Sequence, residues 1–274
     1  MSDPRDPLFT LLSDDDLAMV ELVKQQLVEG GTDNVARLRR MLTADDAAVS
    51  AHVRQVISEI NSREARTEMT LLCATFDEHS DIEHAAWLVA RVFAPDLDLE
   101  PWQEQVDALG REAARLLQDV LMPIRRVEIL AQFLGQEMGF QGNAGNYYLV
   151  GNSLLPRILE TRKGIPLTLT LLYQMVGRRA GLTIEGVNFP GHFIARCDGI
   201  LFDPFDRGSI LSEEACREIL RRQRISPSPE HLQPTSPRVM FRRMLTNLLY
   251  IFQSSGKEDE THLLNDWVQS LSRH

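Results

Sequence analysis

The 274-residue sequence has little cysteine and no long apolar run. Its three cysteines, Cys73, Cys197 and Cys216, form no CxxC pair, and so sparse a set is typical of a reduced protein without disulfides. No apolar stretch approaches the roughly 18 residues that a membrane-spanning helix needs. Residues 1–6 show no secretory signal. We therefore expect a cytoplasmic protein that does not enter a membrane.

Basic residues are outnumbered by acidic ones. The chain has 29 Lys and Arg against 39 Asp and Glu, which gives a formal net charge of −10. A surface that follows phosphates needs clustered Lys and Arg. The short arginine clusters at 37–40, 125–126 and 221–222 lie within helical patterns, where a solvated face is expected. The sequence therefore predicts no nucleic-acid partner.

What the chain has in plenty is apolar residues at helical spacing between residue 14 and about residue 140. Asp45 and Asp46 stand where the third of these helices begins, and Pro123 stands at the expected first position of another. Short helices in succession favour antiparallel pairs stacked in a bundle. The expected helices cover residues 17–27, 35–42, 49–60, 64–76, 82–94 and 102–121.

The pattern changes at 135–145, where four glycines predict a long loop without the signature of a phosphate-binding loop. Downstream, a buried helix is expected at 165–180, closed by Gly181. The remaining expected elements are helices at 153–162, 212–223, 238–253 and 258–272, and strands at 183–187, 192–197 and 200–205. This order predicts a mainly helical α+β protein with three parts: a helical bundle (1–122), a core with a small antiparallel sheet (123–226), and a helical hairpin (237–274).

One pair of side chains indicates chemistry. Asp198-Gly199 predicts a two-residue hairpin turn, which places His192 and Asp203 diagonally on one face of the sheet, roughly 7–8 Å apart. A carboxylate on one imidazole nitrogen fixes the tautomer and leaves the other nitrogen as a base. The alternative is that the two side chains only satisfy each other in a half-buried sheet.

A nucleophile for such a pair is missing. Cys197 alternates to the opposite face, with Phe193 and Ala195. Cys216 and Cys73 are expected to be small core residues, and Cys73 would serve only if it folded over the site.

A metal site at residues 77–84, which hold four carboxylates and two histidines, is a further hypothesis. The spacing is irregular for zinc, and acidic residues also stabilise the start of the next helix. No metal and no other cofactor is expected.

Several short motifs occur in order along the chain. They are Tyr147-Tyr148, Gly151-Asn152-Ser153, Arg162-Lys163-Gly164-Ile165-Pro166-Leu167, Leu171-Leu172-Tyr173, Asn188-Phe189-Pro190-Gly191-His192-Phe193 and Asp203-Pro204-Phe205. Together they resemble the SirB-one family, a branch of the transglutaminase-like superfamily, most densely from about 131 to 210. The terminal hairpin resembles a tetratricopeptide unit.

The resemblance implies a papain-like fold. In that superfamily a cysteine at the start of a buried helix is activated by a histidine and an aspartate on adjacent strands. His192 and Asp203 match the last two, but Pro166 stands at the expected cysteine position. The pair is therefore interpreted as a remnant catalytic dyad. The hydroxyl of Thr168 is a remote candidate for a replacement nucleophile, because threonine is far less nucleophilic than a thiolate.

The resemblance also implies that Tyr148, Asn152, Arg162 and Asn188 line the cleft. Each has an ordinary alternative: Asn152 as the cap of the next helix, Tyr148 packed beneath the loop, Arg162 at the end of its own helix. Two functions follow. The first is a non-catalytic regulatory or accessory protein that binds a peptide or protein partner through the cleft and the helical modules. The alternative is a hydrolase or acyltransferase that uses His192 and Asp203 with an altered nucleophile, its oxyanion held by Asn152, Asn188 or backbone N–H groups at 164–167.

Overall fold

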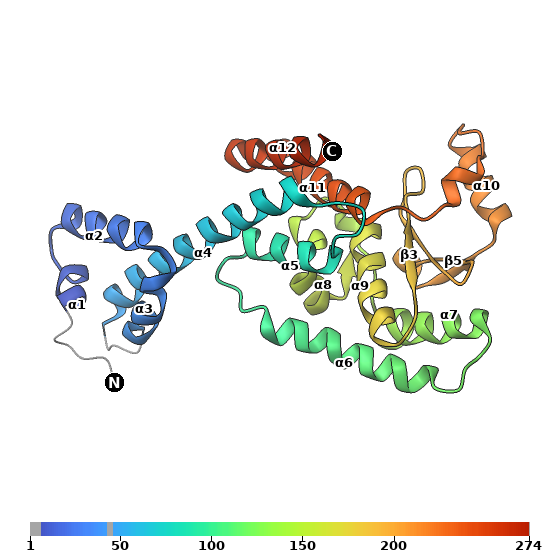
Figure 1. Cartoon of the computed structure of the whole chain (residues 1–274), viewed down its shortest axis with the longest axis horizontal. Coiled ribbons are helices and arrows are strands. Elements are labelled where there is room, and N and C mark those ends of the chain that lie inside the picture. The colour runs from blue at the N-terminus through green and yellow to red at the C-terminus, as the bar shows by residue number, and fades with distance from the viewer. Residues whose placement is uncertain (1–6, 43–45, 274) are drawn as a thin grey trace. The chain divides into compact units, whose positions relative to one another are not determined.

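The structure is a computed structural model that describes residues 7–42 and 46–273 (Figure 1). These residues form twelve α-helices and two small sheets, so the predicted mainly helical α+β class is confirmed. Residues 1–6 and Asp45, used above as sequence signals, lie outside the described residues. The chain divides into two units, described separately here: unit 1 runs up to Leu71 and includes Leu88–Leu97, and unit 2 holds Leu72–Trp87 and the chain from Asp98 onward.

Unit 1 is built from helices that share one apolar core. Helix α1 spans Pro7–Leu12, α2 spans Leu17–Glu29, and α3 spans Val35–Met41. The Asp16 carboxylate accepts hydrogen bonds from the first N–H groups of α2, which satisfies donors that have no partner inside the helix. The core residues come from these helices and from the first part of α4: Leu12, Val20, Val23, Leu27, Val28, Leu38, Met41, Val49, Val53, Val56 and Ile60.

Helix α4 differs from the prediction. A single helix spans Ala47–Thr75, where the sequence suggested two helices at 49–60 and 64–76. The polar residues between the two apolar stripes interrupt the hydrophobic pattern without interrupting the backbone. No Gly or Pro occurs between residues 47 and 75, so nothing breaks the ladder of hydrogen bonds.

The next three helices along the chain lie largely in unit 2, and the first of them continues past Trp87 into unit 1. Helix α5 spans Ile82–Phe93, α6 spans Glu100–Leu117, and α7 spans Pro123–Ala131 with Pro123 at the predicted first position. Helix α7 continues into a π-helical turn over Gln132–Glu137, whose last three residues lie in the loop that the sequence predicted at 135–145. Gly135 sits within this turn because a Cβ there would lie 2.1 Å from the carbonyl oxygen of Arg207. The glycine thus serves close packing rather than flexibility.

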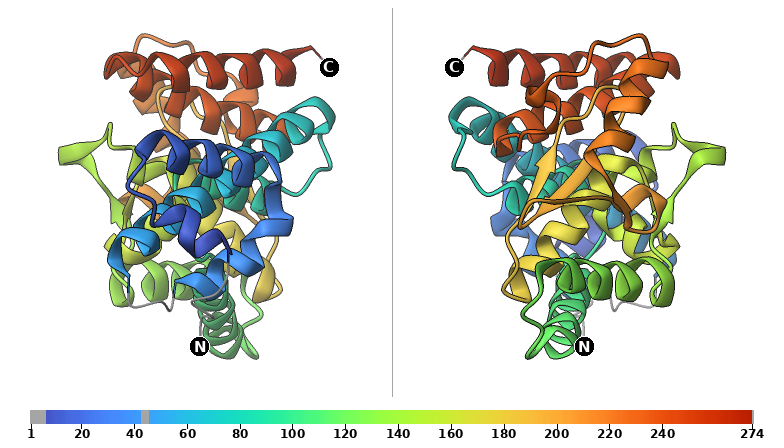
Figure 2. Two further views of the ribbon diagram at one scale, coloured as in Figure 1. Left: turned by 90° about the vertical axis from the view of Figure 1, so that its left-hand side faces the viewer. Right: turned by 90° about the vertical axis from the view of Figure 1, so that its right-hand side faces the viewer.

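A four-stranded antiparallel sheet forms the centre of unit 2 (Figures 1 and 2). Its strands are β3 (Ile184–Val187), β4 (Ile194–Cys197), β5 (Ile200–Asp203) and β6 (Ser209–Leu211). Cys197 pairs with Ile200 across the Asp198-Gly199 turn, as predicted. Helix α9 packs on one face, and α10 (Glu213–Arg222) packs on the other through Cys216 and Leu220.

Helix α9, which spans Pro166–Arg179, is buried over almost its whole length, as its composition predicted. Gly181 follows its end with φ +74°, a conformation that glycine adopts without strain. At its beginning, a short parallel pair joins β1 (Gln141–Gly142) to β2 (Lys163–Gly164). This pair holds the glycine-rich segment beside the chain that leads into α9.

The last two helices form the predicted hairpin (Figure 2). Helix α11 spans Pro237–Ser254 and α12 spans Glu258–Ser272. The buried side chains between them include Leu245, Leu248, Leu264, Trp267 and Leu271. No helix among the described residues has the length and apolar character needed to cross a bilayer.

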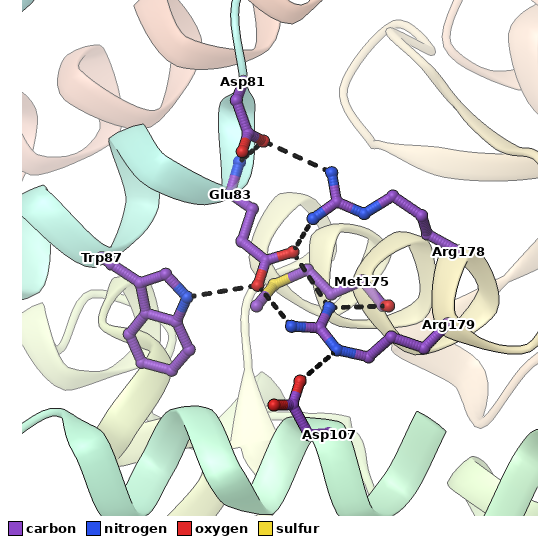
Figure 3. A network of polar contacts seen from close by, with 7 residues as sticks. All are labelled: Asp81, Glu83, Trp87, Asp107, Met175, Arg178 and Arg179. Atoms are coloured by element: carbon purple, nitrogen blue, oxygen red, sulfur yellow. Dashed lines mark hydrogen bonds and ion pairs between the residues drawn. The ribbon is translucent and has the colours of Figure 1, made fainter. Parts of the chain in front are cut away.

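A polar network fixes the far end of α9 (Figure 3). Glu83, the second residue of α5, accepts hydrogen bonds from Arg178, from Arg179 at 2.8 and 3.0 Å, and from the Trp87 indole at 3.4 Å. Arg179 also donates to Asp107 of α6 at 2.5 Å. The Glu83 hydrogen bond is the main cause that raises the pKa of Arg179. The Glu83 carboxylate, whose side chain is only 11% exposed, therefore joins α5 to α9, and Arg179 joins both to α6.

We predict that Glu83→Gln lowers the free energy of unfolding of unit 2 by about 2 kcal/mol, because it leaves two guanidinium groups short of a counter-charge. The value is smaller than for a fully buried pair because the Arg178 side chain is mostly exposed. Urea unfolding followed by tryptophan fluorescence reports on unit 2, which contains Trp87, Trp102 and Trp267.

The matched control is Glu112→Gln, which removes an exposed ion pair with Arg115 three residues further along α6. This variant should unfold at the same urea concentration as the natural protein. Equal unfolding curves for the two variants would show that the Glu83 network contributes nothing to the stability of unit 2.

Candidate functional site

The structure brings together the histidine and the aspartate that the sequence singled out. Nε2 of His192 lies 2.7 Å from Oδ2 of Asp203. The imidazole is 26% exposed and the carboxylate 14% exposed. The two side chains therefore form a hydrogen-bonded pair, called the dyad below, that solvent reaches on the histidine side.

A tight turn positions His192. The strand predicted at 192–197 begins only at Ile194, and the histidine precedes it. The His192 N–H donates to the carbonyl of Phe189 at 2.9 Å, which closes a turn around Gly191 with its φ of +71°. Glycine is suited to that conformation, and a Cβ there would also crowd Gln223 at 3.3 Å. The turn departs from the strand because Pro190 and Gly191 do not favour an extended ladder.

Asp203 is held from the other side. It is the last residue of β5, and it precedes a 3₁₀ turn over Pro204–Asp206. Its Oδ1 accepts the N–H of Phe205 at 2.9 Å, and its carbonyl accepts the N–H of Gly208 at 2.8 Å. Because one carboxylate oxygen is fixed by the backbone, the other is directed at the imidazole.

This geometry defines what the dyad can do. When ionised, the Asp203 carboxylate can accept hydrogen bonds but cannot donate them. A neutral His192 therefore donates from Nε2 and carries its lone pair on Nδ1. Nδ1 is then a base, and the carboxylate stabilises the imidazolium that protonation would form. The Phe205 ring is nearly perpendicular to the imidazole, with the two ring centres 5.7 Å apart.

A chain of contacts connects the dyad to the beginning of α9. The Phe205 ring packs on Gly142, where a Cβ would lie 2.4 Å from the ring. Gly142 is the strand partner of Gly164, two residues before α9 begins. Pro166 is the first residue of that helix and is buried. The expected nucleophile position is thus occupied by a side chain without a reactive group.

The Thr168 hydroxyl has a structural place instead. It is fully buried and donates to the carbonyl of Asn152 at 2.7 Å, with a longer contact to the carbonyl of Ile165 at 3.2 Å. A hydroxyl has one proton to give, and here it links α9 to the preceding turn. The geometry offers His192 no free hydroxyl at this position.

The three thiols are buried as well. Burial raises the pKa of Cys73 to about 12 and that of Cys197 to about 11, and it also raises the pKa of Cys216. Nucleophilic cysteines need the opposite, a lowered pKa and access to solvent. Cys197 faces α9 with Ala195, away from the dyad, as the alternation predicted.

Asn152 corrects one expectation. Its side chain does not cap the next helix, α8 (Leu155–Thr161), whose cap position is Leu154. Its amide nitrogen donates to the carbonyls of Asn146 and Tyr147 at 2.6 and 2.9 Å, and its oxygen accepts from Asn143 at 3.0 Å. The side chain ties the glycine-rich segment together, and its N–H groups are not available to an oxyanion.

The other predicted lining residues lie in different surroundings. Arg162 ends α8 with φ +62°, and its guanidinium lies 4.7 Å from the centre of the Phe140 ring. Asn188 is exposed, and its amide oxygen accepts from Arg243 of α11. Tyr148 is 62% exposed and its ring contacts Tyr250 at 5.3 Å, so it does not pack beneath a loop.

Tyr173 belongs to one of the ordered motifs, but it is not among the site residues predicted from the sequence. It is fully buried, and among the described residues its hydroxyl has no hydrogen-bond partner. Burial and then the charge of Asp203 raise the pKa of this phenol. The hydroxyl also lies beside Gly208, where an added Cβ would approach it to 3.1 Å. In the sequence, the one sign of this buried hydroxyl is a tyrosine within the most apolar helix.

The metal-site hypothesis for residues 77–84 has no support. Asp77 accepts from Ser80 and from the N–H of His79, and Asp81 accepts from the N–H of Glu83. Glu83 itself is engaged by the arginines of α9. Across residues 7–42 and 46–273, no three His, Cys, Asp or Glu side chains are grouped so that they could hold a metal ion.

Comparisons with known proteins support the superfamily that the ordered motifs indicated. Residues 100–246 match the model of the transglutaminase-like superfamily. The chain is 30% identical over 210 residues to a UPF0162 protein of Xylella fastidiosa, which covers 73% of this chain and 75% of that protein. A UPF0162 protein of Pseudomonas aeruginosa is 29% identical over 194 residues, covering 68% and 69%.

A eukaryotic relative shares a shorter part. F-box only protein 21 of Homo sapiens is 27% identical over 203 residues, which span 62% of this chain and 32% of that protein. No solved structure matches the chain.

We predict that the native protein resists alkylation. At pH 8, thiols with a pKa of about 11 to 12 are almost wholly protonated, whereas an ordinary thiol near 8.5 is partly ionised. Iodoacetamide followed by mass spectrometry should label none of the three cysteines in buffer and all three in urea. Labelling of one cysteine in buffer at the rate seen in urea would reveal an accessible thiol.

Proposed function

The chain belongs to the transglutaminase-like superfamily, and we propose that it binds a peptide or protein partner at the surface around the dyad without catalysing acyl transfer. One observation carries the proposal. The histidine and aspartate are assembled at 2.7 Å, yet the start of α9 offers Pro166 in place of a thiol. An activating pair without a nucleophile fits a protein that retains a recognition surface and has lost the chemistry.

The finer assignments belong to the same proposal. The ordered motifs from Tyr147 to Phe205 support membership of the SirB-one family and a regulatory or accessory role. The hairpin of α11 and α12 suits partner binding in the manner of a tetratricopeptide unit, although a single unit must pack on a larger core to be stable. The acidic composition, with a net charge of −10, favours protein over nucleic acid as the partner.

Binding at the dyad surface is tested with a displayed library of random peptides. We expect the natural protein to enrich peptides, and Phe205→Ala to weaken their binding about tenfold, because aromatic side chains dominate such contacts. Leu121→Ala, which removes a 90% exposed apolar side chain after α6, is the control and should leave binding unchanged. Enriched peptides that bind Phe205→Ala equally well would place the partner elsewhere.

A second candidate function rests on the same hydrogen bond. His192 can act as a general base towards water, with Asp203 holding its tautomer, in a hydrolase that needs no protein nucleophile. We expect no such turnover. In panels of ester, amide and peptide substrates, the natural protein and His192→Ala should give the same background rate. A hydrolysis rate that falls at least a hundredfold in His192→Ala would instead establish the hydrolase.

The superfamily relation makes a further prediction about Pro166. A cysteine placed at the start of α9 by Pro166→Cys should have a pKa below the usual 8.5, because the helix N-terminus and an imidazolium both favour the thiolate. Iodoacetamide should label it at pH 7 at least tenfold faster than it labels the double variant Pro166→Cys/His192→Ala. Equal labelling rates would show that this position does not face the dyad.

A further inference from the structure

One arginine next to the turn that carries His192 lacks an ionic partner in the part of the chain that the structure describes. Arg243 of α11 donates to the amide oxygen of Asn188, and its guanidinium carbon lies 5.3 Å from the centre of the Phe193 ring. Among the described residues, no carboxylate lies within ion-pair distance of it. Arg178 and Arg179, in contrast, share Glu83.

The position of Arg243 makes that absence costly. The side chain is partly buried, and burial lowers the pKa of its guanidinium. A cation removed from water is stabilised by an amide oxygen and an aromatic face only in part. A carboxylate supplied by a bound molecule would restore the counter-charge, and the planar guanidinium retains N–H groups for a two-point contact.

A row of aromatic side chains runs beside this arginine. Tyr250 of α11 contacts Tyr148 at 5.3 Å, Tyr148 contacts Tyr147 at 5.2 Å, and Tyr147 contacts Phe205 at 6.3 Å. Tyr148 and Tyr250 are 62% and 54% exposed. Phe205 in turn stands against the dyad histidine. We call these four side chains the aromatic row, and it reaches from α11 to the dyad.

Arg243 lies alongside the middle of the row. It precedes Tyr250 by seven residues, so both are on one face of α11, about 10 Å apart along the helix. Its positive charge also acts on Tyr147, where it partly offsets the burial that raises the pKa of that phenol. Tyrosine and arginine are among the residues that dominate binding energy at protein interfaces, and here exposed tyrosines lie near a partly buried arginine.

We propose that Arg243 and the aromatic row form a docking surface for an extended peptide segment that carries one internal Asp or Glu next to an aromatic or large apolar residue. The acidic side chain pairs with Arg243, and its neighbours pack on the tyrosines. This inference rests on the proposed function, and it names the chemistry of the partner. The segment continues past Arg243 in both directions, because the row extends to Tyr250 on one side and to the dyad on the other.

The charge of the whole protein restricts the partner further. With a net charge of −10, the protein repels a strongly acidic chain at long range. A partner that brings a single carboxylate to the cationic Arg243 is compatible with this net charge. The pairing should also weaken with salt, since surface charges are screened over about 8 Å at physiological ionic strength.

The test uses capped pentapeptide libraries passed over the immobilised full chain. Each library has an acetylated N-terminus, an amidated C-terminus, a fixed central residue and mixed residues at the other four positions. The central residue is Glu, Asp, Gln or Asn, and retained peptides are quantified by mass spectrometry. We expect the Glu and Asp libraries to be retained about tenfold more than their amides, with aromatic residues enriched beside the acid.

Three variants test which residues cause the preference for acid over amide and the enrichment of aromatic residues. Arg243→Gln should abolish the preference for acid over amide, whereas Arg242→Gln, the exposed neighbour on α11, should keep it at the same change of net charge. The double variant Tyr148→Ala/Tyr250→Ala should lose the aromatic enrichment and retain the acid preference. Tryptophan fluorescence in urea checks that each variant is folded.

Each contrary outcome has a distinct meaning. Equal retention of acid and amide libraries, or a preference that survives Arg243→Gln, overturns this inference and leaves the proposed function standing. A parallel library carries a free C-terminal carboxylate in place of the amide. If only its peptides are retained, the claim that an internal Asp or Glu pairs with Arg243 is overturned. No retention of any peptide overturns the proposed function and this inference together.

Discussion

The burial of α9 is the constraint on which unit 2 depends. Nearly every side chain from Pro166 to Gly177 is enclosed, so the helix must be covered on all sides. The sheet covers one side, α6 packs along another, and β1 and β2 close its beginning. Because no part of α9 can move without exposing apolar surface, the chain entering it at Gly164 and the strands packed on it are held in fixed relation.

The two ends of this helix differ in their chemistry. The far end is charged, and Arg178 and Arg179 are neutralised by Glu83 from α5 and Asp107 from α6. The beginning is apolar apart from hydroxyl and amide groups that bond to the backbone, as Thr168 and Asn152 do. The charged network thus fixes the far end of α9, and burial with backbone hydrogen bonds fixes its beginning.

Near the beginning of α9, the dyad is a well-formed part of an incomplete catalytic site. Asp203 is fixed by the N–H of Phe205, and His192 is placed by the turn at Gly191. Such support is what a catalytic pair needs, but it equally gives a binding surface a defined shape. Arg243 contacts Asn188 and Phe193 on either side of that turn, and the aromatic row reaches Phe205 beside the dyad. The recognition surface can therefore persist where the nucleophile does not.

The sequence by itself determined the elements that local physics governs. The helical spacing of apolar residues located α5, α6, α9, α11 and α12, and Asp198-Gly199 fixed the register of the hairpin. That register in turn predicted the contact between His192 and Asp203. Side-chain alternation and turn chemistry depend only on neighbouring residues, so one sequence is enough to read them.

Tertiary structure decided the rest. It joined two predicted helices into α4, because a polar gap in an apolar stripe does not break a backbone without Gly or Pro. It turned part of the glycine-rich segment into a π-helical turn and a strand, because Gly135 and Gly142 admit the close approach of Arg207 and Phe205. It also assigned Glu83 to two arginines about 95 residues away and left Arg243 without a carboxylate partner among the described residues. Pairing between distant residues depends on how the elements pack, and no local pattern in the chain encodes it.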